Sequence, residues 1–159
     1  VRYLLASDAG YGFLVRLGDM MSRNRNGKAM LNLPPGAAPL TPLPVSDPET
    51  QRVVAVTNEG RMLIFPLADL PELSRGKGNK IIQIPKERAR SHEEYLAHLL
   101  LLPAGFDLVV HAGRRHVTLR GVTLEGFVGL RGRRGRMLPR GFRNVKMLEA
   151  LSHQPVQAE

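Results

Sequence analysis

The sequence predicts an all-β, propeller-like chain made of about three blades of short antiparallel strands. Short apolar segments are paired around turns that contain glycine, which is the pattern of β-hairpins. The turn glycines Gly10, Gly60 and Gly113 are 50 and 53 residues apart, so the unit repeats along the chain. A repeat of about 40–50 residues with β content is typical of propeller blades, which bury their faces by stacking on one another.

The first unit opens with an apolar strand at residues 3–7 and returns through residues 11–17. A basic loop at residues 22–28 follows, and an apolar strand is expected at residues 29–33. Prolines then break the pattern, because proline lacks the backbone N–H that a strand donates. They form a connector to the second unit.

The second unit repeats this order, with a strand at residues 52–57 and its return at residues 61–65. A second basic loop, residues 74–80, places three cations and two glycines in seven residues, and a strand is expected at residues 81–84. Glycine has no Cβ and tolerates positive φ, so such a loop can lie flat against a phosphate-bearing surface.

An insertion precedes the third unit, and the sequence leaves its structure open. Residues 91–94 resemble a helix capping box, which predicts a short helix over residues 93–99. Residues 99–102 fit a buried strand equally well, because periodicity cannot separate a helix from a strand over so short an apolar run.

The third hairpin is expected from residues 106–111 and 115–119. A third basic loop, residues 129–136, follows it, and a last strand is expected within residues 144–151. We expect the three blades and a polar tail to occupy, in order, residues 1–45, 50–88, 95–151 and 152–159.

The chain is strongly basic, with a formal net charge of +9. Residues 111–146 hold ten Lys and Arg residues and one acid, Glu125, so nearly all of the excess lies there. A field this localised attracts polyanions, with nucleic acid the first candidate and an anionic membrane surface the second. Aromatic residues make up only 5% of the chain and Trp is absent, which disfavours base stacking and leaves contact with phosphates.

Composition excludes several classes of protein. The absence of cysteine excludes disulfides and thiolate metal sites and suits a reducing cytosol. The longest apolar run, residues 99–103, is too short to cross a bilayer, so no membrane insertion is expected. The chain begins at Val1, without an initiator Met or the apolar core of a signal peptide, and we expect a piece of a longer polypeptide.

No catalytic or metal site is expected. Nucleophilic catalysis has no support, because cysteine is absent and no Ser, His and Asp set is suggested. The histidines do not match the His-Glu-x-x-His pattern of a zinc helix, so surface or core positions are expected for them.

The three basic loops are the candidate DNA contacts. Their cations would bind phosphates, which positions a duplex without reading its sequence. The expected DNA-binding residues are Arg23, Arg25, Lys28, Arg75, Lys77, Lys80, Arg131, Arg133, Arg134 and Arg136.

Four segments carry a resemblance to a known family. Residues 3–13, 60–63, 73–82 and 131–135 resemble the C-terminal domain of the A subunit of bacterial DNA topoisomerase IV, which belongs with the gyrase A C-terminal domains. The resemblance implies a β-pinwheel, in which blades of about four strands swap hairpins with their neighbours and a basic outer rim bends DNA. The glycine-rich heptapeptide that marks gyrase is missing, and the second basic loop is a relaxed version of it, which favours the topoisomerase IV branch.

The same resemblance implies a function. This piece would contact duplex phosphates, position the transported DNA segment and tune substrate preference in decatenation and supercoil relaxation. It would be non-catalytic and without a cofactor, because cleavage and the ATP and Mg sites would lie on other domains. Its partners would be duplex DNA and, in an A2B2 holoenzyme, the remainder of the A subunit together with the ATPase B subunit. The enzyme would act in the bacterial cytoplasm, at the nucleoid.

A protein-interaction platform is the alternative. Arg-rich loops also dock acidic proteins through bidentate carboxylate pairs, and a chromosome-organising protein would be a candidate partner. A catalytic unit is a third hypothesis, which would require nuclease or ligase activity of the chain, and none is expected.

Overall fold

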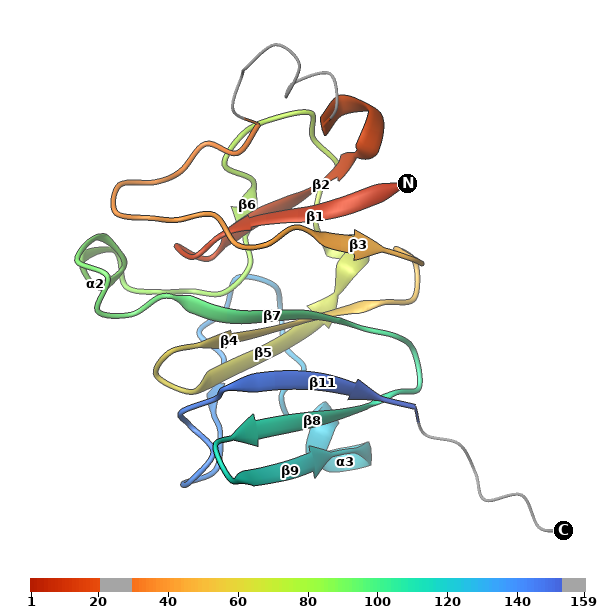
Figure 1. The fold of residues 1–159 in the computed structure, drawn as a ribbon, viewed down its shortest axis with the longest axis vertical. Coiled ribbons are helices and arrows are strands. Elements are labelled where there is room, and N and C mark those ends of the chain that lie inside the picture. The colour runs from red at the N-terminus through yellow and green to blue at the C-terminus, as the bar shows by residue number, and fades with distance from the viewer. Residues whose placement is uncertain (21–29, 153–159) are drawn as a thin grey trace, which may run out of the picture.

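Three small antiparallel sheets, each centred on one hairpin, follow one another along the long axis of the molecule in the computed structural model (Figure 1). The structure describes residues 1–20 and 30–152. Three helices lie wholly within these residues, and all are short: the 3-10 helix η1 spans Leu67–Asp69, α2 spans Lys86–Arg90 and α3 spans Gly121–Glu125. The all-β expectation is confirmed.

The first sheet has the strand order β3-β1-β2-β6. Strands β1 (Arg2–Ser7) and β2 (Tyr11–Arg16) form its hairpin. Strand β3 (Leu43–Val45) pairs with β1, and β6 (Asn79–Lys80) pairs with β2. Because β6 comes after the second hairpin in the chain, a short strand crosses from one unit to the preceding one.

The second sheet repeats this exchange, with the order β10-β5-β4-β7. Strands β4 (Arg52–Thr57) and β5 (Arg61–Pro66) form the hairpin, and β7 (Leu96–Leu102) pairs with β4. The short strand β10 (Arg136–Met137) follows the third hairpin and pairs with β5.

The third sheet has three strands within the described part of the chain, in the order β11-β8-β9. Its hairpin consists of β8 (Asp107–Ala112) and β9 (Arg115–Leu119). Strand β11 (Met147–Leu151) pairs with β8 and lies within the residues 144–151 where the sequence predicts a last strand. This sheet lies at the end of the molecule opposite to the first sheet (Figure 1).

The second sheet is buried on both faces because it lies between the other two. Alternate residues of a strand point to opposite faces. Val53 and Ala55 of β4 therefore pack in the core shared with the first sheet, while Val54 and Val56 pack in the core shared with the third. Burial on both faces explains the unbroken apolar run of β4, and each fully buried Val contributes about 1.5–3 kcal/mol of transfer free energy.

Residues 81–84, which the sequence predicts to be a strand, are not one. Strand β6 ends at Lys80, and the isoleucines that follow pack into the core between the first two sheets. The N–H of Ile81 donates to the carbonyl oxygen of Gly10 at 2.6 Å, and its carbonyl oxygen accepts from the N–H of Gly132 at 3.0 Å. These backbone hydrogen bonds join Ile81 to the first hairpin turn and to the third basic loop and are not part of a strand ladder. An apolar run indicates burial, and burial does not require a strand ladder.

The expected strand at residues 29–33 is also wrong for the part that the structure describes. Ala29 lies outside the described residues, and residues 30–33 form only an isolated bridge between Leu31 and Gly76.

The helix of the insertion is α2 rather than residues 93–99. After α2, His92 adopts a φ of 62°, a left-handed conformation that a helix does not continue through. Residues 96–102 form β7, in which Leu100 lies opposite Val54 of β4. The strand alternative for residues 99–102 is confirmed, because pairing with the buried strand β4 distinguishes strand from helix where periodicity could not.

Within the described residues, no helix is long and apolar enough to cross a membrane.

Candidate nucleic-acid interface

The second basic loop is held at both ends on strand β2. Glu72, just before the loop, forms a parallel bridge with Leu14. Lys80, at the end of the loop, then pairs antiparallel with Tyr11 of the same strand. The loop therefore leaves the sheet and returns to it with both ends fixed by backbone pairing.

The third basic loop is held in the same way on strand β5. Val128 forms a parallel bridge with Ile64, and Arg136 pairs antiparallel with Met62. The two loops therefore occupy equivalent positions on successive sheets, as the sequence repeat predicts.

Successive loops also bond directly to one another. The N–H of Gly76 donates to the carbonyl of Met30, and the N–H of Asn32 donates to the carbonyl of Gly76, both at 2.9 Å. The N–H of Gly132 donates to the carbonyl of Ile81 at 3.0 Å. The second and third basic loops thus form one continuous surface, which we call the basic rim and define as residues 74–83 and 129–136.

Two glycines allow the rim to lie against the sheets. Gly78 has a φ of 86°, and a Cβ at this position would overlap the backbone of Gly12 in β2. Gly135 has a φ of 79°, and its Cβ would lie 2.8 Å from the carbonyl oxygen of Met62 in β5. Only glycine satisfies both the left-handed backbone and the close approach. These two glycines are therefore structural residues of the basic loops.

Three of the predicted contact residues present unpaired charge. Arg75, Lys77 and Arg133 are exposed, and none of them forms an ion pair with another described residue. The Nζ of Lys77 lies 4.5 Å from the ring centroid of Tyr11, in a cation–π contact that leaves its charge available.

Three further predicted residues are bonded to neutral groups. Arg131 donates to the carbonyl of Lys80 at 2.8 Å, and Lys80 donates through Nζ to Oε1 of Gln83 at 2.6 Å. Arg136 donates to the carbonyl of Gly126 at 2.6 Å. These bonds fix the side chains without neutralising them, so the three residues still contribute positive charge to the rim.

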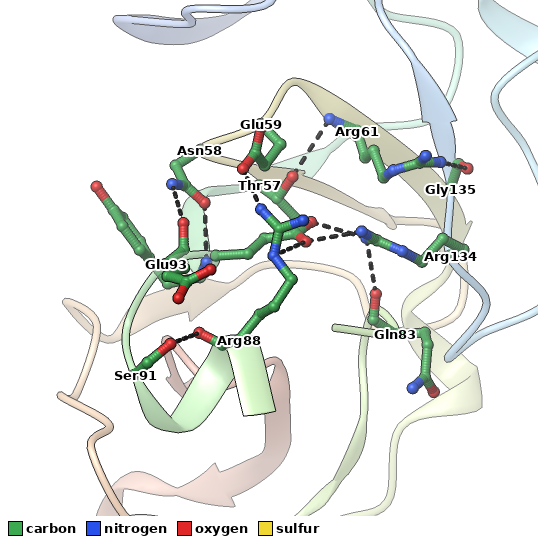
Figure 2. Close-up of polar contacts among 12 residues, drawn as sticks. Thr57, Asn58, Glu59, Arg61, Gln83, Arg88, Ser91, Glu93, Arg134 and Gly135 are labelled. Carbon is green, nitrogen blue, oxygen red and sulfur yellow. Dashed lines mark hydrogen bonds and ion pairs between the residues drawn. The ribbon is translucent and has the colours of Figure 1, made fainter. Parts of the chain in front are cut away.

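Arg134 lies in the rim but points its guanidinium inward. It donates two hydrogen bonds of 2.7 Å to the carboxylate of Glu94, whose side chain is fully buried, and one of 3.1 Å to the carbonyl of Gln83. Arg88 of α2 approaches the same carboxylate at 3.8 Å and also bonds Glu59 (Figure 2). The charge of Arg134 is thus matched inside the molecule, unlike that of Arg133.

Sequence analysis missed Glu94 and Arg88. Nothing in the local pattern connects Glu94 with a cation 40 residues later. No local signal marks Glu94 as buried, because it follows the exposed polar residues 91–93 and precedes β7. The remaining predicted contacts, Arg23, Arg25 and Lys28, lie outside the described residues.

Glu72 pairs with two cations next to the second basic loop. Its Oε1 accepts from Nε of Arg2 at 2.8 Å and from Nε of Arg16 at 3.2 Å. The hydrogen bond from Arg2, together with the bond and the charge of Arg16, holds the pKa of Glu72 below its usual value. These two arginines therefore belong to the scaffold of the loop.

The described residues contain no group of three His, Asp or Glu side chains arranged to hold a metal ion. What this surface presents is a set of cations on loops that backbone hydrogen bonds hold in place.

Comparisons with known proteins agree with this geometry. The family described as the DNA gyrase C-terminal domain, beta-propeller, matches residues 3–38 and 51–90. The solved C-terminal domain of E. coli ParC superposes with a TM-score of 0.86 and 44% identity, covering 96% of this chain and 61% of that one. The chain belongs to the gyrase A C-terminal domain family.

Relatives of this chain are found in several bacteria. The chain is 54% identical over 146 residues to the A subunit of DNA topoisomerase 4 from Pseudomonas aeruginosa and 45% identical over 148 residues to the corresponding protein of Escherichia coli. These matches cover 92% and 93% of the chain and 19% of each relative, so the chain spans about a fifth of their length. Single short strands, β6 and β10, cross between neighbouring units where swapped hairpins were expected. The fold class and the family expected from the sequence are both confirmed.

Proposed function

We propose that the chain is the DNA-binding and DNA-bending module of a topoisomerase IV A subunit. The observation that supports this most is the continuity of the basic rim, in which Arg75, Lys77 and Arg133 present unpaired charge on backbone-bonded loops. A rigid row of cations matches a duplex, which carries one negative charge per about 1.7 Å of its axis.

Phosphate contact gives the module a mechanical role. The loops sit on successive sheets, so a duplex that binds more than one of them must follow the line from sheet to sheet. Such contacts position DNA without reading its sequence. In the enzyme, this would hold the transported segment at a set angle and so tune decatenation and supercoil relaxation.

The rest of the enzyme would supply the chemistry. In this proposal the chain is a non-catalytic part of a type II topoisomerase, with no cofactor of its own. The remainder of the A subunit would cut DNA, and the B subunit would hydrolyse ATP with Mg, in an A2B2 holoenzyme at the nucleoid in the bacterial cytoplasm.

The test is binding of the 159-residue chain to a short duplex in a salt titration. If the chain contacts about six phosphates, the logarithm of the association constant should fall with the logarithm of the salt concentration, with a slope of about −5. The triple variant Arg75→Ala/Lys77→Ala/Lys80→Ala should bind more weakly, with a slope shallower by about 2.7.

A charge-matched control separates the rim from net charge. Arg114→Ala/Arg140→Ala/Lys146→Ala also removes three positive charges, from exposed positions in loops flanking β8, β9 and β11. It should retain most of the affinity. Failure of the wild-type chain to bind DNA at low salt, or equal losses in both variants, would contradict the proposal and favour the protein-interaction platform.

A further inference from the structure

A pocket of about 380 Å³ lies beside the basic rim, between the second basic loop and α2. Its walls come from three segments that are far apart in the sequence: the loop at Pro34 and Pro35, the start of β2 at Tyr11, and residues 77–90. The loop at Gly36 lies directly against the carbonyl of Arg90, so the segments are in contact. We refer to this site as the α2 pocket.

Among the described residues, four cations and no acid line the α2 pocket. Its charged lining residues are Lys77, Lys80, Lys86 and Arg90. Cations that line one cavity repel each other, and repulsion grows as the cavity excludes water. A group of this kind is stabilised by a bound anion, and it would hold a phosphate more strongly than isolated surface lysines do.

The two faces of α2 are used differently. Lys86 and Arg90 are four residues apart, so they lie on the same face of the helix. Arg88 points away from this face and pairs with Glu59 (Figure 2). Its Nε also lies 3.8 Å from the carboxylate of Glu94. Within the described residues neither Lys86 nor Arg90 has an ion pair, although both are exposed. Pairing of Arg88 fixes the helix, and the opposite face presents unpaired charge to the pocket.

The other two cations of the pocket are held by their surroundings. Lys77 lies over the ring of Tyr11, and Nζ of Lys80 is bonded to Gln83 at 2.6 Å. Since these side chains are already ordered, binding an anion between them and α2 costs less side-chain conformational entropy.

We propose that the α2 pocket binds a phosphate group of the duplex, which makes Lys86 and Arg90 further DNA-contacting residues. This inference rests on the proposed function and extends it: the DNA path runs off the second basic loop, past Tyr11, and onto the insertion helix. The insertion then has a role of its own, because it adds a phosphate site that the repeated loops do not contain.

The test compares Lys86→Ala/Arg90→Ala with the wild-type chain in duplex titrations at several salt concentrations. Both residues are exposed, and Ala favours a helix, so the variant should keep its fold, as thermal unfolding will show. We expect the duplex affinity to fall by roughly tenfold or more near 0.1 M salt and the slope to become shallower by about 1.8. Arg114→Ala/Lys146→Ala removes the same charge elsewhere and should lose much less.

The outcomes separate this inference from the proposed function. If the wild-type chain binds the duplex steeply and Lys86→Ala/Arg90→Ala loses no more than its control, the α2 pocket is not a DNA site while the proposed function stands. If the wild-type chain binds no duplex, both fail.

Inorganic pyrophosphate, measured by calorimetry, distinguishes the source of the phosphate. The inference is supported if pyrophosphate binds weakly to the wild-type chain and not to Lys86→Ala/Arg90→Ala, and if that variant also loses duplex affinity. The α2 pocket is then a phosphate site that DNA occupies. Tight pyrophosphate binding with unchanged duplex binding overturns the assignment to DNA.

Discussion

Arg134 and Glu94 form a bidentate ion pair, with both N–H···O distances at 2.7 Å, that joins the third basic loop to the segment entering β7. The carboxylate is fully buried, whereas the guanidinium side chain is 30% exposed. A loop that sequence analysis assigns wholly to DNA binding therefore contains one cation that holds the molecule together. The pair connects the insertion to the third basic loop, so the position of this part of the rim depends on it.

Loss of Arg134 should destabilise the fold. Arg134→Ala leaves the buried carboxylate of Glu94 with only the more distant Arg88, and breaking a buried pair in this way costs about 3–5 kcal/mol. Urea unfolding measures the change in the free energy of unfolding. The neighbouring Arg133→Ala is the matched control, because Arg133 is exposed, and its effect should stay within about 0.5 kcal/mol. Equal effects of the two substitutions would show that the ion pair does not hold the loop.

Arg133 should show the opposite behaviour in DNA binding. Removal of one phosphate contact makes the salt slope shallower by about 0.9. Arg133→Ala should therefore weaken duplex binding at low salt and leave thermal unfolding unchanged. A slope identical to that of the wild-type chain would remove Arg133 from the interface.

Gly78 should not tolerate a side chain. Gly105 has a similar φ of 79° but open space around it, so Gly105→Ala should cost only the left-handed strain of about 1–2 kcal/mol. Gly78→Ala meets the backbone of Gly12 as well, and overpacking adds about 1–3 kcal/mol. The comparison is made by chemical denaturation. If Gly105→Ala proves the more damaging of the two, close packing of the loop on β2 is not what requires glycine.

Glu72 should give the first sheet a pH-dependent stability. Its pKa in the folded chain is lowered, chiefly by the hydrogen bond from Arg2, so its ionised form stabilises the fold above the unfolded-state pKa. This contribution is lost as the pH falls through the folded-state pKa.

The variant Glu72→Gln reports on this contribution. It should have a lower Tm than the wild-type chain at neutral pH, and the difference should vanish in acid and shrink in high salt, because exposed pairs are screened. A difference in Tm that persists below the folded-state pKa would indicate a packing role for Glu72 instead.

The repeated features of this chain were predictable because their causes are local. Gly10 and Gly60 adopt positive φ at the hairpin turns, and glycine is the residue that does so at low cost, so the turns are visible in the sequence. The unbroken apolar run of β4 likewise indicates a strand with both faces buried. The position of the basic loops followed from the same repeat.

Which segments pair as strands, and which cations remain without an ion pair, depends on tertiary contacts. Residues 81–84 and 96–102 are both apolar, yet the first is a buried loop and the second a strand, because only the second lies along β4. Arg133 and Arg134 are adjacent and chemically identical, but a carboxylate 40 residues earlier in the chain neutralises one of them. The sequence by itself determined the repeat, the all-β class and the basic loops. Folding determined the contacts between distant segments, since their energies depend on distances that local sequence does not encode.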